Sequence, residues 1–101
     1  MRKIKLFLTA LAVMITSVAF AQKLTVTGNV TDASTGEPVP FASVHEKGTM
    51  NGVNTDVNGQ YSITVSKDGI IVFSSVGYNT VEIPVDGKAK INCNLPVDTE
   101  T

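Results

Sequence analysis

The chain has 101 residues, with eight basic and nine acidic side chains, one His, one Cys and no Trp. This length allows one small domain and excludes a TIM barrel or a Rossmann fold. The formal net charge of −1 shows no excess of basic residues of the kind that binds nucleic acid. A single Cys excludes an internal disulfide framework and a multi-Cys metal site.

The first 21 residues have the pattern of a secretory signal peptide. Three basic residues precede an uncharged apolar run over 6–18, and an Ala-x-Ala cleavage signature ends at Ala21. At about 1.5 Å per residue the run reaches only about 20 Å, which is too short for a hydrocarbon core of about 30 Å. We therefore predict an export signal over 1–21, a domain over 22–96 and a disordered tail or start of a linker over 97–101.

The segment after the signal has a different composition from the whole chain. It keeps five Lys and no Arg against nine acids, so its formal charge is −4. All eight Gly fall in this segment, spaced as turn residues, and no stretch of it shows a helical period of 3.6 residues. We predict no transmembrane segment in this part of the chain.

Alternation of apolar and polar residues predicts a series of short strands. Over 24–30 the apolar side chains fall on every second residue, as in a strand with one buried face. The run over 70–73 is apolar throughout, which is typical of a central strand covered on both faces. The expected strands lie at about 24–30, 40–47, 53–55, 60–65, 70–73, 81–83 and 89–95.

Turn residues recur every eight to twelve residues, which is the pattern of an antiparallel β-sandwich. The sequence therefore predicts an all-β fold, a single seven-stranded antiparallel β-sandwich of immunoglobulin-like architecture. In the second strand we expect Ala42 and Val44 to face one way and Phe41, Ser43 and His45 the other. In the last strand we expect Ala89, Ile91, Cys93 and Leu95 to face inward.

Cys93 is an unpaired Cys in a chain predicted to be exported. It could pair with another chain or react as a free thiol. Its place on the apolar face of the last strand favours a small buried hydrophobe instead.

Five sequence pieces, in this order, resemble the carboxypeptidase-regulatory-like domain. They lie at 27–32, 35–40, 42–49, 55–62 and 71–78. The resemblance implies a transthyretin-like β-sandwich of the kind found at the N-terminus of SusC-like TonB-dependent outer-membrane receptors of Gram-negative bacteria. In such receptors the domain is followed by a TonB-contacting segment, a plug and a barrel, so the chain is either a piece of a receptor or a free-standing copy. The motif residues expected to have structural roles are Gly36, Pro38, Gly48, Asp56, Gly59, Tyr61, Gly77 and Tyr78.

Two patterns suggest chemistry, and each has a simpler interpretation. Residues 54–59 imitate the start of an EF-hand loop, but Val65 stands where the bidentate acid is required, so a hairpin turn at Asp56 to Gly59 is favoured. Ser43 lies on the same strand face as His45, but Glu46 points to the opposite face and cannot orient the imidazole, so an outward-facing strand His is favoured over a catalytic one. We expect no catalytic residue, metal ligand or cofactor-binding residue.

These observations predict a non-catalytic interaction module, exported to the periplasm or outer membrane, with partners in the outer-membrane receptor system. The alternative is a free-standing periplasmic or cell-surface module that binds protein or carbohydrate. In either case Phe41 and His45 are the expected surface contacts.

Overall fold

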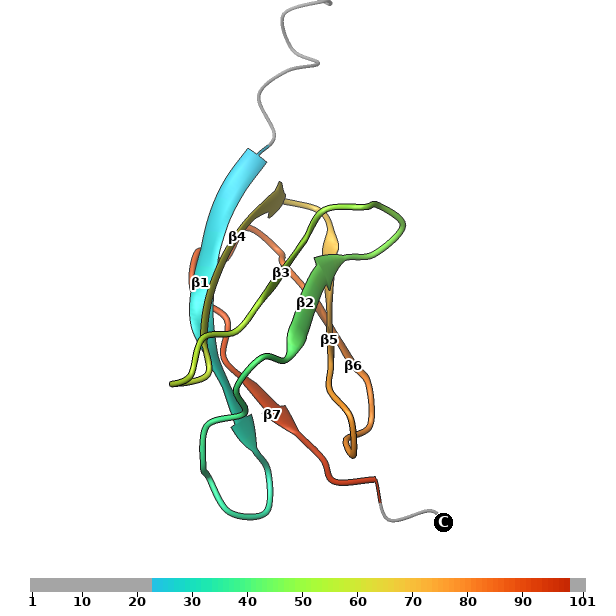
Figure 1. Cartoon of the computed structure of the whole chain (residues 1–101). Coiled ribbons are helices and arrows are strands. Elements are labelled where there is room, and N and C mark those ends of the chain that lie inside the picture. The colour runs from blue at the N-terminus through green and yellow to red at the C-terminus, as the bar shows by residue number, and fades with distance from the viewer. Residues whose placement is uncertain (1–22, 99–101) are drawn as a thin grey trace, which may run out of the picture.

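The computed structural model describes residues 23–98, and the predicted export signal lies outside this range. These residues form seven strands and no helix (Figure 1). No helix of this part of the chain is long and apolar enough to cross a membrane. The strands are β1 (Lys23–Asp32), β2 (Ser43–Glu46), β3 (Gly52–Asn54), β4 (Gln60–Ser66), β5 (Ile70–Ser74), β6 (Val81–Pro84) and β7 (Cys93–Leu95).

The strands form two sheets, which confirms the predicted all-β fold of seven strands. One sheet has three strands in the order β4-β1-β7, and the other has four in the order β3-β2-β5-β6. The long strand β1 runs along one side of the molecule, and the chain leaves at the end opposite to the start of β1 (Figure 1).

Strands β1 and β4 form the longest pairing of the molecule, antiparallel from Lys23↔Ser66 to Asn29↔Gln60. Both strands alternate between buried and exposed residues, as the sequence predicted. Because a shift of one residue would expose every buried side chain of a strand, this alternation fixes the register. The inward residues join one core, and the ring of Tyr61 packs edge-on against Phe73 with centroids 5.5 Å apart.

The pairing of β7 differs from the prediction, because β7 runs parallel to β1 rather than antiparallel. It lies beside the second half of β1, from Val30↔Cys93 to Asp32↔Leu95. Sequence alternation reports which face is buried but carries no sign of strand direction, so it could not predict a parallel pair.

The segment before β7 is less regular than the sequence predicted. Ile91, Cys93 and Leu95 are buried as expected, whereas Ala89 is exposed. Only an isolated bridge from Lys90 to Thr27 pairs this segment with β1. The strand expected from 89 is therefore regular only from Cys93.

The second strand is shorter than predicted because the backbone of Phe41 is left-handed, with φ of 57°. Regular pairing begins only at Ser43. The buried Thr55 holds this corner, since its Oγ1 donates to Val39 O and accepts from Ala42 N–H, both at 2.8 Å.

Strand β5 is central in its sheet and buries three consecutive residues, as its continuous apolar run predicted. Ile71 and Phe73 point into the core. Val72 faces outward and is still only 7% exposed. His45 and Glu82 lie directly across from Val72 on the two neighbouring strands, where their side chains can cover it.

The end of the described chain is held to the domain. Val97 forms an antiparallel bridge with Tyr78, and the backbone N–H groups of Asn79 and Asp98 donate to Pro96 O and Gly77 O. Residues 96–98, around the predicted domain boundary, are therefore hydrogen-bonded to the segment between β5 and β6.

Candidate functional site

Phe41 and His45, the expected surface contacts, lie in different environments. Phe41 is 66% exposed on a left-handed backbone, and its N–H donates to Thr55 O at 3.1 Å. His45 is half-buried in the outer face of β2, beside Gly52 of β3. Since the backbone turns between Phe41 and β2, the two side chains do not follow one strand face.

The acid next to His45 is directed away from it. Glu46 is buried, and its two carboxylate oxygens accept from Asn51 Nδ2 at 3.3 Å and from Ser66 N–H at 3.2 Å. This carboxylate therefore joins the β2–β3 loop to the end of β4. Within residues 23–98 no group of three or more His, Cys, Asp or Glu side chains is placed to hold a metal ion.

The turn before β4 is built by Asp56. Its Oδ1 accepts from the backbone N–H groups of Asn58 and Gln60, both at 2.9 Å. Gly59 closes the turn with φ of 75°, and a Cβ there would lie 2.5 Å from Val30 O. This segment is a tightly packed turn, but it leads from β3 in one sheet to β4 in the other, so it does not form the hairpin that the sequence predicted.

The middle of the three-stranded sheet has an unusually close backbone contact. A Cβ at Gly28 would lie 1.9 Å from the carbonyl oxygen of Ile91. That oxygen accepts a hydrogen bond from the Tyr61 hydroxyl at 2.5 Å, in place of the bond from a backbone N–H of β1 that regular strand pairing would provide. The Asn29 N–H beside it bonds to Asn92 Oδ1 at 3.0 Å. Tyr61 and Gly28 together therefore accommodate a carbonyl that turns into the core.

Tyr78 lies at the end where the chain leaves. Its hydroxyl donates to Asp32 Oδ2 at 2.8 Å, while Asp32 Oδ1 caps the following turn by accepting from the N–H groups of Ser34 and Thr35. These bonds, that of Tyr78 first, lower the pKa of Asp32, and the same carboxylate raises the pKa of Tyr78. This contact joins the end of β1 to the chain between β5 and β6.

The remaining motif residues shape turns and their packing. Gly36, Gly48 and Gly77 have φ of 77°, 79° and 88°, which is the left-handed region that favours glycine. Pro38 bridges to Thr31 and lies next to Gly59.

Cys93 is 1% exposed in β7, in agreement with its predicted role as a buried hydrophobe. Burial raises the pKa of its thiol to about 11. A thiol with this pKa is almost entirely protonated near neutral pH and reacts slowly.

A groove of about 490 Å³ lies on the outer face of the β1–β4 pair, and we call it the β1–β4 groove. Thr27 and Asn29 of β1 and Gln60 and Ser62 of β4 are exposed there and pair across the two strands. The chain entering the Asp56 turn borders it on one side. Its lining residues are Thr27, Gly28, Asn29, Asn54, Asp56, Gln60, Tyr61, Ser62 and Lys90.

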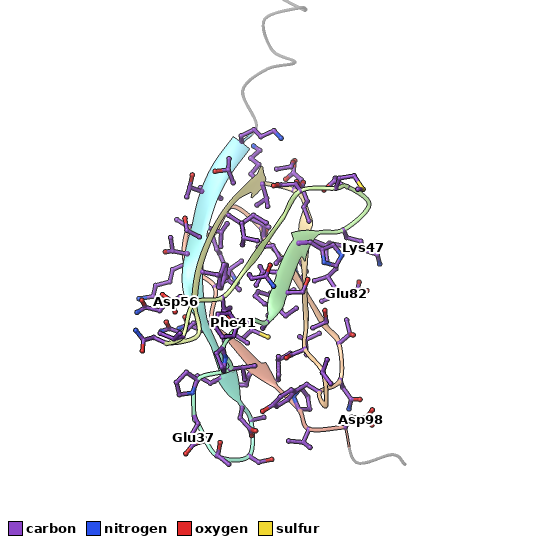
Figure 2. The ribbon with its side chains drawn as sticks, in the orientation of Figure 1. Glu37, Phe41, Lys47, Asp56, Glu82 and Asp98 are labelled. Atoms are coloured by element: carbon purple, nitrogen blue, oxygen red, sulfur yellow. The ribbon has the colours of Figure 1, made fainter. Side chains whose placement is uncertain are left out.

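Charged side chains of the opposite sheet lie apart from this groove. Lys47 and Glu82 form an ion pair of 2.8 Å on the four-stranded sheet (Figure 2). Figure 2 shows Asp56 on the other side of the molecule, Phe41 near the middle, and Glu37 and Asp98 near the end where the chain leaves. The groove and the ion pair thus lie on different sheets.

The groove was not predicted from the sequence, although the polar residues that line it are visible there. The exposed faces of the first and fourth strands carry only Thr, Asn, Gln and Ser, which the sequence shows as the polar half of the alternation. The hollow itself depends on how the chain from Asn54 to Asp56 and the segment at Lys90 border these strands, and neither position can be read from the sequence.

Comparison with known proteins assigns the fold to a family. Residues 26–101 match the CarboxypepD_reg-like domain. The TonB-dependent receptor SusC of Bacteroides thetaiotaomicron is 46% identical over 82 residues, which cover 81% of this chain and 8% of that receptor. The TonB-dependent receptor P3 of Formosa agariphila is 32% identical over 98 residues, which cover 96% of this chain and 10% of that receptor.

These receptors are much longer than the chain, which spans a tenth or less of each, and its similarity lies with their N-terminal region. The family assignment rests on nearly the whole described sandwich, from the middle of β1 through β7. The chain belongs to the CarboxypepD_reg-like domain family.

Proposed function

We propose that this chain is an exported, non-catalytic interaction module of a TonB-dependent receptor system at the Gram-negative outer membrane. The observation that carries the proposal is the 46% identity to the N-terminal region of one such receptor across most of the chain. The prediction of an export signal over 1–21 agrees with this location.

Loops rather than sheet edges are the proposed points of contact. Of the four outer strands, β3, β6 and β7 have only three or four residues each. The fourth, β4, has seven residues, but Gln60 O, Thr64 O and Ser66 N–H already bond to groups outside the sheet. Strand β6 also carries Glu82 and ends in Pro84, and a charge and a proline both discourage the addition of another strand. Three of the four edges therefore offer little length for pairing with a partner, and the longer edge at β4 is partly occupied by the domain itself.

Phe41 is the proposed contact residue. A bulky residue in the left-handed region is strained by about 1–2 kcal/mol, and such strain is concentrated at functional positions. Here it holds a ring that is two-thirds exposed. Burial of this ring by a partner would return hydrophobic free energy that the isolated domain does not gain. His45 has a supporting position in the sheet and is not proposed as a contact.

Photo-cross-linking in bacterial cells tests this proposal. A photoreactive amino acid replaces Phe41 in one variant and Glu82 at the β6 edge in a matched control. We expect the variant at 41 to cross-link to a TonB-dependent receptor polypeptide, its own downstream chain included, and the control at 82 to give little product. Cross-links from 41 only to other proteins would support the free-standing alternative and contradict the proposal.

A further inference from the structure

Strand β4 forms the longest edge among the strands of residues 23–98. It borders its sheet over seven residues, whereas the other edge strands have three or four. The sequence of β4 contains no charged residue, no Pro and no Gly. A charge or a Pro commonly keeps an edge strand from pairing with another chain, as Glu82 and Pro84 do in β6. Strand β4 therefore has no such protection in its own sequence.

The backbone of β4 directs every second residue away from the sheet. Thr27, the register partner of Ser62, uses both its N–H and its carbonyl oxygen on the far side of β1, toward the segment at 89–91. Ser62 and Thr27 are therefore a pair without mutual hydrogen bonds, and the N–H and C=O of Ser62 point to the outer edge. By the same alternation, the other even-numbered residues of β4 also direct their backbone groups outward.

Three side chains from the chain before β4 lie over this edge. Asn51 Nδ2 donates to Thr64 O at 2.6 Å, and the buried Glu46 accepts from Ser66 N–H at 3.2 Å. Asp56 bonds to both backbone groups of the first residue of β4, each at 2.9 Å. We call Glu46, Asn51 and Asp56 the edge cover, because they occupy outward groups that a neighbouring strand would otherwise use.

The outward groups in the middle of β4 form a self-complementary set once Asn51 is released. Within residues 23–98, no hydrogen bond is made by the Ser62 N–H, the Ser62 C=O or the Thr64 N–H. Release of Asn51 adds the Thr64 C=O, so that each of the two residues then has a donor and an acceptor. Two antiparallel copies of β4, related by a two-fold axis at Ile63, place Ser62 of one copy opposite Thr64 of the other. Every N–H of the set then meets a C=O of the other copy.

We propose that the edge cover keeps β4 from pairing with β4 of a second copy of this chain, and that release of Asn51 opens this contact. The bond of 2.6 Å from Asn51 to Thr64 O places the Asn51 side chain where the partner strand would lie. In the dimer the two three-stranded sheets join into one continuous sheet, and β4 becomes an inner strand. This inference does not depend on the receptor assignment.

Analytical ultracentrifugation of Asn51→Ala tests this inference, with Asn54→Ala as the matched control. Each change removes an Asn whose Nδ2 donates to a backbone carbonyl, but the carbonyl that Asn54 holds belongs to Phe41, outside β4. We expect Asn51→Ala to dimerise with a Kd at least about tenfold lower than that of the parent chain, equivalent to about 1.4 kcal/mol. Asn54→Ala should keep the Kd of the parent. Equal Kd values of Asn51→Ala and the parent, or of the two variants, would overturn the proposal.

Amide hydrogen exchange and a double variant locate the contact. The N–H groups of Ser62 and Thr64 should exchange fast in the parent chain and slowly in the Asn51→Ala dimer, while those of β6 stay unchanged. Asn51→Ala/Ser62→Pro removes one outward N–H, and an edge strand tolerates Pro where its N–H faces away from the sheet, so we expect a return to the monomer. Protection confined to another surface, or a folded double variant that still dimerises, would overturn the proposal. The dispersed amide spectrum of each variant reports that it is folded.

Discussion

The two tyrosines of the domain hold two regions together in opposite ways. In the middle of the sandwich, Tyr61 is 5% exposed, packs on Phe73 and donates to the Ile91 carbonyl, which itself lies against Gly28. At the end where the chain leaves, Tyr78 is only partly buried and donates to the Asp32 carboxylate. The first contact depends on tight packing and the second on charge.

This difference indicates which region fixes the fold and which can adjust. A buried carbonyl in close contact with backbone can neither move nor exchange its partner for water. A carboxylate at the rim can do both. Of the two regions, the one around Tyr78 is therefore the one in which a local rearrangement costs less.

The largest expected effect is that of Gly28→Ala in the middle region. A methyl group 1.9 Å from the Ile91 oxygen must displace backbone, so we expect a loss of about 4 kcal/mol or more in the free energy of unfolding, measured by urea denaturation. Gly36→Ala is the control. Its Cβ would meet no atom within 4 Å, and only the left-handed φ should cost about 1–2 kcal/mol. Similar losses in the two variants would show that the close contact is not decisive.

The next effect is that of Tyr61→Phe. The substitution keeps the ring and leaves the Ile91 carbonyl buried without its donor, which should cost about 1–3 kcal/mol in urea denaturation. An unchanged urea midpoint would mean that water replaces the hydroxyl and that the middle region is less dry than its burial indicates.

Alkaline pH should weaken the middle region. Burial raises the pKa of Tyr61 from 10.0 to about 12, so the folded state holds this proton more tightly than the unfolded chain does. The resulting stability is complete below pH 10 and is lost as the pH rises toward 12. Cys93 contributes with the same sign, since burial raises its pKa from 9.0 to about 11. The urea midpoint should fall as the pH rises from 10 toward 12, and it should fall less steeply in Tyr61→Phe. Identical pH profiles of the two proteins would contradict the assignment of this pH dependence to Tyr61.

The smallest effect is expected from Tyr78→Phe at the exit end. The Tyr78 hydroxyl is the main cause that lowers the pKa of Asp32, so the variant should return this pKa toward the ordinary value of 3.8 in an NMR titration. In the parent chain the contact contributes stability above pH 3.8, which is lost as the pH falls through the lowered pKa. An Asp32 pKa that stays unchanged in the variant would assign the shift to the bonds from Ser34 and Thr35 instead.

The parts of the fold that the sequence predicted are those set by local pattern. The alternation of apolar and polar residues predicted which faces of β1 and β4 are buried. The continuous apolar run over 70–73 predicted that β5 is a central strand. The Asp56 to Gly59 turn followed from residue types that accept its backbone angles. The inward position of Cys93 followed from the same alternation.

The parts that could not be predicted depend on contacts between distant residues. The parallel direction of β7, the exposure of Ala89 and the left-handed backbone of Phe41 are set by how segments meet in space. The partner of Tyr78 lies 46 residues away at Asp32. For the same reason the groove was missed, although each polar side chain that lines it was visible in the sequence.

Native-state amide hydrogen exchange tests the contrast between the two regions most directly. The N–H groups of Thr27 and Ile91, in the middle, bond to Ala89 O and Thr27 O, and those of Asn79 and Asp98, at the exit end, bond to Pro96 O and Gly77 O. We predict that the middle pair exchanges only through global unfolding, and that the exit pair exchanges much faster through local opening. Equal protection of the two pairs would contradict the account.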